Sequence, residues 1–315
     1  MKRPYDNIKY YALNQSPLYK LTTKRKLAAL FNISTQELLS LASREDNYRV
    51  FQINRSSGKP RTVEVPKPHL ERVHHRLFFL LSRITPPKFL HSGVKSRSYI
   101  TNAEAHVGAN RLVKLDIKKF FPSTKAWHVS EFFIVYMKCT PDVAGILTAL
   151  CTCEGHVPTG SCVSQILAYY AHMGMFKQIY ELANELGVNM TCYVDDIAFS
   201  GKNANKALLS SASKIMMARG LVCHKERVYR GDQPKIVTGV VVTADKIKLP
   251  NRRHLQIFTE YQQLQHAAEE SDVEKRLEIL LGRVNAAAEL NSIYRPRAKR
   301  LQHNLTRIKN QKITA

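Results

Sequence analysis

The sequence predicts an α+β fold, in which helical segments at both ends flank a central region of short strands. Apolar residues recur at helical spacing near the N-terminus and again in the C-terminal part of the chain. Between these ends, short runs of alternating apolar and polar residues are bounded by Gly, Pro, Asn and Ser, which is typical of strands. Together these patterns favour a mixed chain over an all-helical or an all-strand one.

The N-terminal part is expected to form two short helices, over Thr22–Leu30 and Ser34–Ser40. The sequence from Ser34 to Glu37 fits a capping box, which marks the start of the second helix. The pair superficially resembles a helix-turn-helix, a module that would bind duplex DNA, but no base-reading residues stand out. A hairpin is expected next, with strands over Tyr48–Ile53 and Lys59–Val65.

The central region is expected to alternate helices with strands, and the part from 86 to 108 is expected to be a loop. The expected helices cover His69–Ile84, Ser123–Met137, Ser161–Leu186 and Ala204–Arg219. The expected strands cover Arg111–Ile117, Leu221–His224, Glu226–Tyr229, Lys235–Thr243 and Lys246–Leu249. From about residue 252 the tail is expected to be mostly helical, with Leu255, Phe258, Tyr261 and Leu264 at helical spacing.

The charge of the chain points to a polyanionic partner. It has 48 Lys and Arg against 25 Asp and Glu, a formal net charge of +23, and nucleic acid is the simplest partner for such an excess. The segment 291–315 contains no acidic residue. Its cations are Arg295, Arg297, Lys299, Arg300, Arg307, Lys309 and Lys312. A membrane-surface role is disfavoured because this segment lacks a matching apolar face.

No membrane segment or secretory signal is expected. No run approaches the roughly 18 apolar residues that a spanning helix needs, and Met1–Lys9 lacks an apolar signal core. The six cysteines form no paired CxxC framework, and Cys151-Thr152-Cys153 alone is a weak metal signal. We interpret them as reduced packing residues of a cytoplasmic protein.

The tetrapeptide Tyr193-Val194-Asp195-Asp196 is the strongest chemical signal. It lies between two short apolar runs, so its adjacent carboxylates are expected at the tip of a strand-turn-strand unit. They repel each other, nothing local neutralises them, and a divalent cation would do so. Asp116 is expected near the end of the strand Arg111–Ile117, on one face with Lys114. One acidic strand end and one acidic hairpin tip form a layout that can hold two metal ions for nucleotidyl transfer.

Five motifs, read in order, give the chain a family likeness. It resembles reverse transcriptases and, within them, the bacterial retron type. The motifs are Asn102-Ala103-Glu104-Ala105-His106, Lys114 to Ser123, Val157 to Ser161, Tyr193 to Asp196, and Val237-Thr238-Gly239. The first and last match the Asn-Ala-x-x-His and Val-Thr-Gly patterns that distinguish retron enzymes. The resemblance runs from Tyr48 to Pro250 by motif, and the tail matches only as a helical, basic thumb.

The resemblance implies a right-hand polymerase fold, with fingers, a palm built on an antiparallel sheet, and a helical thumb. It implies a helical extension over 1–47, fingers and palm over 48–245, and an RNA-binding thumb over 246–315. The implied activity is RNA-directed DNA synthesis from dNTPs, with a structured non-coding RNA as both template and primer. Synthesis would start from a guanosine 2′-hydroxyl and give a branched RNA–DNA product. A role in antiphage defence with a partner effector protein is also implied.

The resemblance also assigns roles to residues. Asp116 and Asp195 would coordinate two Mg²⁺ ions, with Asp196 as a secondary ligand and the carbonyl of Ile117 completing the second site. The nucleotide-binding residues would be Phe121 as a steric gate, Arg61, Thr159 and Gly160. Those at the primer and template would be Pro158, Tyr193 and Val194. RNA recognition would fall to Asn102, His106, Val237, Thr238, Gly239, Arg295, Arg297 and Arg300.

Structural alternatives remain open for several of these residues. Phe121 would equally serve as a core phenylalanine beside Phe120, and Lys59 and Lys67 compete with Arg61 for the triphosphate. Residues 237–239 would also suit an ordinary strand. His106, as a lone histidine, would serve local structure as readily as RNA recognition. Tyr294, among the cations of the tail, is expected to stack on a loop base.

The chain departs from the family pattern at four places. Thr159 stands where glutamine is frequent, and Val163-Ser164 where a Ser-Pro pair is frequent. His224 stands where the family favours asparagine. Arg227 aligns with a lysine thought to protonate pyrophosphate, and arginine does not readily give up a proton. Lys225, His224 or water would then take that role, or none of them would.

Two rival functions remain. One is a reverse transcriptase of another lineage, such as the intron type. The lack of a maturase segment and the two retron patterns weigh against it. The other is a non-catalytic RNA-binding module on a polymerase fold, against which the intact Asp116, Asp195 and Asp196 weigh.

Overall fold

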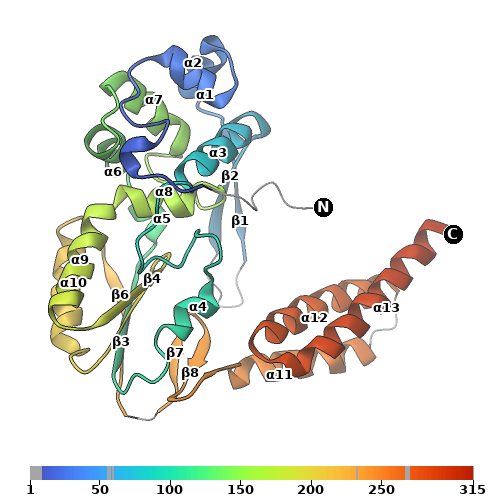
Figure 1. Cartoon of the computed structure of the whole chain (residues 1–315). Coiled ribbons are helices and arrows are strands. Elements are labelled where there is room, and N and C mark those ends of the chain that lie inside the picture. Colours follow the sequence, from blue (N-terminus) through green and yellow to red (C-terminus); the bar gives the residue numbers. More distant parts are fainter. Residues whose placement is uncertain (1–8, 55–57, 59, 232, 267–269, 315) are drawn as a thin grey trace. The chain divides into compact units, whose positions relative to one another are not determined.

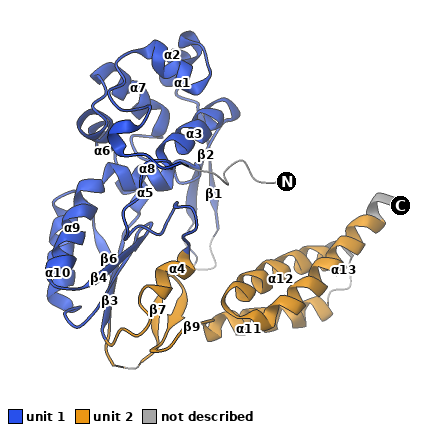
Figure 2. Cartoon of the chain, viewed as in Figure 1, with its two compact units in different colours: residues 1–98, 111–228 blue, residues 99–110, 229–315 orange. Residues whose placement is uncertain are grey.

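The computed structural model describes residues 9–54, 58, 60–231, 233–266 and 270–314 (Figure 1). They form two compact units, one of residues 1–98 and 111–228, the other of residues 99–110 and 229–315 (Figure 2). Each unit contains both helices and antiparallel strands, so the predicted α+β class is confirmed. The boundaries of the units, at 98/99, 110/111 and 228/229, differ from the expected segment boundaries at 47/48 and 245/246.

The N-terminal helices belong to the core of the first unit. They are α1 (Lys24–Phe31) and α2 (Thr35–Ser43), and each starts at the expected kind of cap. The Oγ of Ser34 accepts a hydrogen bond from the backbone N–H of Glu37 at 3.0 Å. Both helices pack against α7 (Pro141–Cys151), and their buried leucines join one continuous apolar core with the central region. Helices α1 and α2 therefore share the apolar core of the first unit.

The first unit holds a two-stranded hairpin and a four-stranded sheet. The hairpin pairs β1 (Tyr48–Ile53) with β2 (Arg61–Pro66) in antiparallel register. The sheet has the order β4-β5-β3-β6, and β5 pairs antiparallel with both β3 and β4. Its strands are β3 (Leu112–Ile117), β4 (Asn189–Tyr193), β5 (Asp196–Ser200) and β6 (Cys223–Tyr229).

Helices pack around this sheet and hairpin. Helix α9 packs against β4, α10 against β3, and α3 against β2. The helical elements of the first unit, besides those above, are η1 (Leu13–Gln15), α3 (Pro68–Leu81), α5 (Phe120–Ser123), α6 (Ala126–Glu131), the π-helix η2 (Phe132–Tyr136), α8 (Ser164–Ala171), α9 (Met173–Glu185) and α10 (Lys206–Met217).

The prediction of one long helix over Ser161–Leu186 is wrong, because the chain breaks at His172 between α8 and α9. The backbone of His172 has φ −117° and ψ 17°, outside the helical range. Its buried ring lies 3.2 Å from the hydroxyl of Thr124, a contact between residues distant in sequence. Nothing in the local sequence marks this break, since Gly174 lies two residues further on.

The strands after residue 221 also differ from expectation. One strand, β6, replaces the two expected over 221–229, whereas the single strand expected over 235–243 is a hairpin of β7 (Lys235–Val237) and β8 (Val240–Val242). With β9 (Ile247–Lys248) these form the sheet of the second unit. Helix α4 (Tyr99–Glu104), which lies inside the expected loop, packs against β7 and β8.

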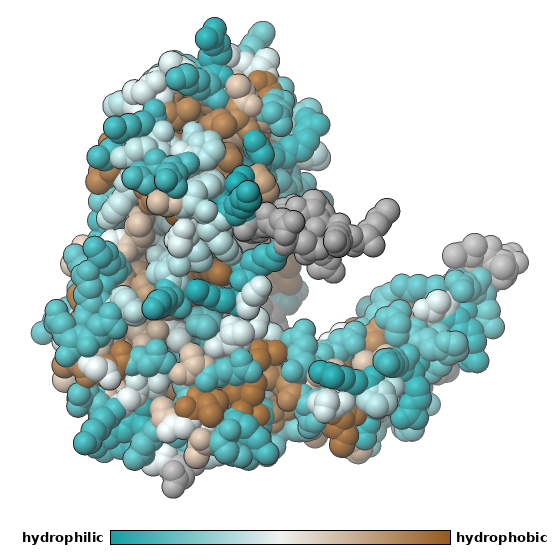
Figure 3. All heavy atoms as spheres, in the orientation of Figure 1, coloured by the Kyte–Doolittle hydropathy of each residue, from teal (hydrophilic) through white to brown (hydrophobic). Residues whose placement is uncertain are grey.

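The tail forms helices, as predicted: α11 (Asn251–Gln265), α12 (Glu270–Leu290), the short η3 (Ser292–Tyr294) and α13 (Arg295–Thr314). They enclose a small apolar core of their own that includes Ile257, Leu280 and Leu301. Hydrophilic residues cover most of these helices on the face in Figure 3. Among the described residues, no helix combines the length and apolar character needed to cross a membrane.

The cysteines are free thiols, as expected. Cys139, Cys151, Cys153 and Cys192 are buried, which agrees with a packing role. Cys162 is exposed, so the interpretation of all six as packing residues is wrong at that position.

Candidate active site

The structure brings the three aspartates of the predicted site together on neighbouring strands. The register of β3 and β5 places Asp116 directly opposite Asp196. The backbone N–H of Ile117 donates a hydrogen bond to the carbonyl of Asp195 at 2.9 Å, which ties the end of β3 to the hairpin tip. The acidic strand end and the acidic tip, 79 and 80 positions apart in the numbering, thus share one edge of the sheet.

The tip is a two-residue loop held under strain. Tyr193 pairs with Asp196, leaving Val194 and Asp195 as the loop. Val194 has φ 59°, a left-handed conformation that is costly for a β-branched residue, on the order of 1–2 kcal/mol. Its backbone N–H donates to the Oγ of Ser92 at 3.0 Å, so a residue outside the motif helps to fix the loop.

The three carboxylates have different electrostatic surroundings. Burial, together with the negative charges of Asp116 and Asp196, raises the pKa of Asp195 to about 6. Asp196 accepts a bond from the Nζ of Lys114 at 3.0 Å through Oδ2, and both side chains are only 17% exposed. The expectation that nothing neutralises the tip is therefore wrong, because β3 supplies a cation across the sheet.

Asp116 lies beside two basic side chains of β6. The Nδ1 of His224 is 3.2 Å from Oδ1 of Asp116, and the Nζ of Lys225 is 3.6 Å from Oδ2. Arg227, at the position of the family's lysine, is exposed. The alternatives weighed for the pyrophosphate proton, His224 and Lys225, are thus the β6 groups nearest to Asp116 in the structure.

The carboxylate oxygens of Asp116, Asp195 and Asp196 suit a hard cation, although the described side chains do not surround a single metal position. Among the residues that the structure describes, no group of three or more His, Cys, Asp or Glu side chains converges on one point. The Oδ1 of Asp196 is nevertheless buried without a hydrogen-bond partner, and Asp116 and Asp195 repel each other. Carboxylate oxygens with unbalanced negative charge are the ligands that Mg²⁺ takes. These residues fit such an ion, with Asp116 and Asp195 as the pair able to share it.

Phe120 and Phe121 have separate places in the structure. Phe120 is 4% exposed and contacts the rings of His172 and Phe176, so it fills the core. Phe121 is half-buried, with its ring centroid 6.0 Å from that of Phe120. The steric-gate role of Phe121 stays a prediction.

The cations of the hairpin also differ from one another. Arg61 starts β2 opposite Ile53, and its side chain is exposed. Lys67, which competes with Arg61 as the triphosphate-binding residue, forms an ion pair with Asp46 at 2.7 Å. Its charge is therefore already paired within the protein. Lys59, the other competitor, lies outside the described residues.

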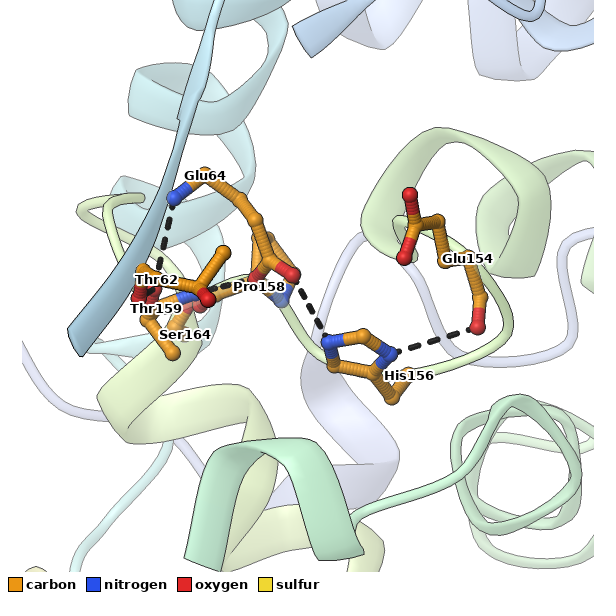
Figure 4. Close-up of polar contacts among 7 residues, drawn as sticks. All are labelled: Thr62, Glu64, Glu154, His156, Pro158, Thr159 and Ser164. Carbon is orange, nitrogen blue, oxygen red and sulfur yellow. Dashed lines mark hydrogen bonds and ion pairs between the residues drawn. The ribbon is translucent and has the colours of Figure 1, made fainter. Parts of the chain in front are cut away.

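The loop from Val157 to Ser161 is fastened to β2 by a buried carboxylate (Figure 4). Glu64 is 3% exposed, and its Oε2 accepts the backbone N–H of Thr159 at 3.0 Å. The hydroxyl of Thr159 donates to the carbonyl of Thr62 at 3.0 Å. The carbonyl of Pro158 accepts a bond from the Oγ of Ser164 at 2.6 Å. Pro158 and Thr159, predicted for template and nucleotide, are thus held in place by the protein itself.

Two histidines also hold the loop from Val157 to Ser161 in place. The Nε2 of His156 lies 2.9 Å from Oε1 of Glu64, and its Nδ1 lies 3.2 Å from the carbonyl of Glu154 (Figure 4). On the other side of the loop, His74 lies 2.6 Å from the Oγ of Ser161 and 2.7 Å from the carbonyl of Leu150. Burial lowers the pKa of His74 to about 4, so its ring is neutral. The loop is therefore held from both β2 and α3.

Gly160 is required by close contact with β2. A Cβ at this position would lie 2.7 Å from the carbonyl oxygen of Glu64, a distance that real Cβ atoms do not reach. The backbone N–H of Gly160 donates to that same oxygen at 3.0 Å. The expected close approach of a template base to Gly160 stays a prediction. In the structure, the backbone that approaches Gly160 closely is that of β2.

The two retron patterns meet in the second unit. Asn102 and His106 lie on or just after α4 and are buried, at 0% and 1% exposure. Both polar atoms of the Asn102 side chain lack a hydrogen-bond partner among the described residues. The hydroxyl of Thr238 donates to the carbonyl of Tyr99, the first residue of α4, at 2.7 Å. Segments over 130 residues apart in the numbering are thereby joined.

Val237 ends β7, but Thr238 and Gly239 form the turn between β7 and β8, so the ordinary-strand alternative is wrong at these two positions. Their φ angles are 46° and 74°, the signature of a type I′ turn. Threonine at the first turn position costs on the order of 1–2 kcal/mol relative to residues that favour positive φ. The bond to Tyr99 offsets this cost and explains why threonine is suited to the position.

Thr238→Val is expected to destabilise the protein by about 2 kcal/mol, because valine keeps the strain but loses the bond to Tyr99. Thr238→Asn should cost less than about 1 kcal/mol, because asparagine tolerates positive φ and carries polar atoms. Urea unfolding of both variants beside the parent measures the difference. Equal stability of Thr238→Val and the parent would contradict this account.

The predicted RNA-binding cations of the tail are exposed on α13. Its apolar side, Ala298, Leu301 and Leu305, is buried against the other helices. The exposed residues include Arg295, Arg297 and Arg300. The expected stacking of Tyr294 on a base is wrong for this structure, because the ring is 6% exposed and its hydroxyl lies 2.5 Å from Nδ1 of His254.

Several residues of the site were not predicted from the sequence. Lys114 had a signal, since it shares the polar face of its strand with Asp116. Glu64 had a weaker one, as an acid inside a strand pattern. Ser92 and His156 had none, because their partners are set by tertiary contacts.

Comparison with known proteins confirms the predicted resemblance to retron reverse transcriptases. No family model matches the chain. The retron Se72 reverse transcriptase of Salmonella heidelberg is 30% identical over 66% of this chain and 55% of that protein. The retron Mx65 enzyme of Myxococcus xanthus is 30% identical over 70% of this chain and 58% of its own length. The retron Ec48 enzyme of Escherichia coli is 26% identical over 80% and 68%.

The match therefore spans between 55% and 68% of the length of these relatives. Among solved structures, a foamy viral protease-reverse transcriptase in complex with double-stranded DNA covers 85% of this chain and 43% of that chain. It is 17% identical with a TM-score of 0.45, a distant likeness.

Proposed function

We propose that this chain, a relative of the retron reverse transcriptases, is an RNA-directed DNA polymerase with fingers, palm and thumb. The observation that carries the proposal is the register of β3 and β5, which aligns Asp116 with Asp196 and ties Ile117 to Asp195. Paired carboxylates at one sheet edge, in a chain with a net charge of +23, suit phosphate chemistry on nucleic acid.

The reaction would be an in-line attack of a primer hydroxyl on the α-phosphorus of a dNTP. Asp116 and Asp195 would hold two Mg²⁺ ions, with Asp196 and the carbonyl of Ile117 in support. When bound, the ions would supply Lewis-acid stabilisation of the attacking and leaving oxygens.

Other residues of the chain would orient the substrates. Phe121 would limit the space beneath the sugar, and Arg61 would bind the triphosphate as a charged fork. Tyr193 and Val194 would contact the primer end. The loop of Pro158, Thr159 and Gly160 would support the template base, since Glu64 and His74 hold it rigidly in place. His224 or Lys225, both beside Asp116, would donate the proton to pyrophosphate.

The finer proposal follows from the retron likeness. A dedicated non-coding RNA would serve as template and primer, synthesis would start at a guanosine 2′-hydroxyl, and the product would be branched RNA–DNA. Antiphage defence with an effector protein would be its biological role. Asn102, His106 and the turn Val237-Thr238-Gly239 would shape the RNA-recognising surface, and the arginines of α13 would bind RNA phosphates.

Expression of the gene with its native flanking DNA tests this proposal. Nucleic acid from these cells, and from cells carrying Asp195→Asn/Asp196→Asn, is run on a denaturing gel. We expect a short abundant DNA that shifts on RNase treatment and is absent with the double variant. If no such DNA forms but the purified protein extends a primer on RNA, the chain is a reverse transcriptase of another lineage. If neither activity is found, the chain is an RNA-binding module.

A triple Arg295→Gln/Arg297→Gln/Arg300→Gln variant is expected to bind RNA with a weaker salt dependence. Each lost phosphate contact lowers the slope of log K against log salt by about 0.7–0.9, so the slope should fall by about 2. The matched control is Lys24→Gln/Arg25→Gln/Lys26→Gln, which removes the same charge from exposed positions of α1. Filter binding to a hairpin RNA across a salt series measures both. Equal slopes for the two variants would refute the role of α13.

A further inference from the structure

A basic hollow lies in the first unit, built from residues other than the three aspartates. It has a volume of about 340 Å³. The residues around it are Lys119, Pro122, Ser123, Lys125, Trp127, His128, Arg219 and Gly220. They come from the turn after β3, from α5 and α6, and from the end of α10. Three cations are among these described residues around the hollow, and no carboxylate is.

The two lysines are exposed and available to a ligand. Within the described part of the chain, neither Lys119 nor Lys125 forms an ion pair with a carboxylate. Lys119 has φ 51°, a strained conformation for a residue with a side chain. Like charges near one another repel, so their placement around one hollow costs free energy unless an anion is bound there.

The other side chains of the hollow are held in position by contacts within the protein. The guanidinium of Arg219 is held by both carboxylate oxygens of Glu131 and lies 5.1 Å from the ring centroid of Trp127. Trp127 stacks on His128, with centroids 3.5 Å apart. His128 accepts the backbone N–H of Lys125 at 2.9 Å through Nδ1 and donates to the carbonyl of Arg219 at 3.1 Å through Nε2. Its neutral ring thus joins α6 to the end of α10.

Trp127 is 52% exposed despite these contacts. At the surface, the indole of Trp127 forms an apolar wall beside the positive charges of Arg219, Lys119 and Lys125. Nucleotide chains present the same alternation of apolar rings and phosphates.

We propose that this hollow is a phosphate-binding site, in which Lys119 and Lys125 hold the phosphate and Trp127 forms the wall beside it. The ligand would be a phosphate group that carries more than one negative charge or is linked to further phosphates. Its source is a nucleic-acid strand that passes over the first unit, or a free polyphosphate such as the by-product of nucleotide transfer. The site does not depend on the polymerase function, because it needs none of the aspartates.

The chain offers a direct probe, because Trp127 is its sole tryptophan. Its fluorescence therefore reports on this hollow without a label. Purified full-length protein, free of added metal, is titrated at constant ionic strength with sodium tripolyphosphate and with a single-stranded oligothymidylate. We expect saturable quenching by at least one probe.

Variants show whether the signal comes from the proposed contacts. Lys119→Ala/Lys125→Ala is expected to weaken binding about tenfold or more, as loss of charge-assisted bonds predicts. The matched control, Lys177→Ala/Lys206→Ala, removes the same charge from exposed positions on α9 and α10 and should change binding less than twofold. Circular dichroism and ligand-free Trp127 emission verify that both pairs fold.

Each outcome bears on the proposal. Tighter binding of tripolyphosphate assigns the site to free polyphosphate, and tighter binding of oligothymidylate assigns it to a strand. Absence of quenching with both probes overturns the proposal. Equal weakening in the two lysine pairs also overturns it, because the attraction would then be a general effect of net charge.

Discussion

Asp195→Asn is expected to abolish DNA synthesis and, at the same time, to make the metal-free protein more stable above pH 6. Asparagine has the shape of aspartate but cannot supply the charge that a Mg²⁺ ion needs. Loss of several kcal/mol of transition-state stabilisation corresponds to a rate at least about 10³-fold lower. Primer extension on an RNA template measures this loss, and RNA binding should be unchanged.

The stability gain follows from the raised pKa of Asp195, which is about 6 in the folded protein against an ordinary value of 3.8. The folded state holds its proton more tightly, so ionisation of Asp195 removes stability as the pH rises from about 4 to about 6. Asparagine avoids this penalty. The gain should be on the order of 1–2 kcal/mol above pH 6, after allowance for partial exposure, and absent below about pH 4.

Thermal unfolding in a chelator at both ends of this pH range measures the gain. Asp142→Asn is the control, because Asp142 is an exposed residue in the first turn of α7. It should keep full activity. A variant at Asp195 that loses activity and stability together at high pH would contradict the electrostatic account of the site.

Glu64→Ala is expected to cost about 3 kcal/mol of unfolding free energy, more than the change expected for Thr238→Val. Glu64 is buried and accepts bonds from the backbone N–H of Thr159 and from His156. Its removal leaves two partly buried groups without their hydrogen-bond partner. Glu64→Gln keeps the shape and one acceptor, so about half the loss is expected.

Urea unfolding of both variants measures these costs. Glu71→Ala, at an exposed position of α3 whose side chain is 50% exposed, should change stability by less than about 0.5 kcal/mol. The Glu64 variants should also show a raised KM for dNTPs, because the loop of Thr159 and Gly160 loses its hold on β2. Unchanged stability in Glu64→Ala would show that water replaces the carboxylate without cost.

The sequence allowed the placement of the three aspartates on strand ends to be predicted because its signals there are local. The alternation in β3 located Asp116, and the apolar runs around Tyr193–Asp196 located the hairpin tip. The start of the helix capped by Ser34 was also predicted within one residue. In each case, neighbouring residues carry the information.

The features that were missed depend on contacts between distant segments. The break at His172 follows from its buried contact with Thr124, and α8 and α9 would otherwise continue as one helix. The turn at Thr238 is stabilised by Tyr99, and without that bond valine and threonine at 237–238 favour a strand. The partners of Glu64 and Lys114 belong to other elements. Such pairs carry no signal in a single sequence.

The register that joins β3 to β5 also has a consequence for folding. The hairpin of β4 and β5 can form within microseconds, because its strands are adjacent in sequence. Pairing of β3 with β5 must first close a loop of roughly 80 residues, so it belongs to the late, cooperative step. Asp195 and Asp196 are therefore present on a formed hairpin before Asp116 joins them. A nascent or partly unfolded chain carries its cations but has no complete acidic centre. Strand pairing thus delays assembly of the three aspartates until the first unit has folded.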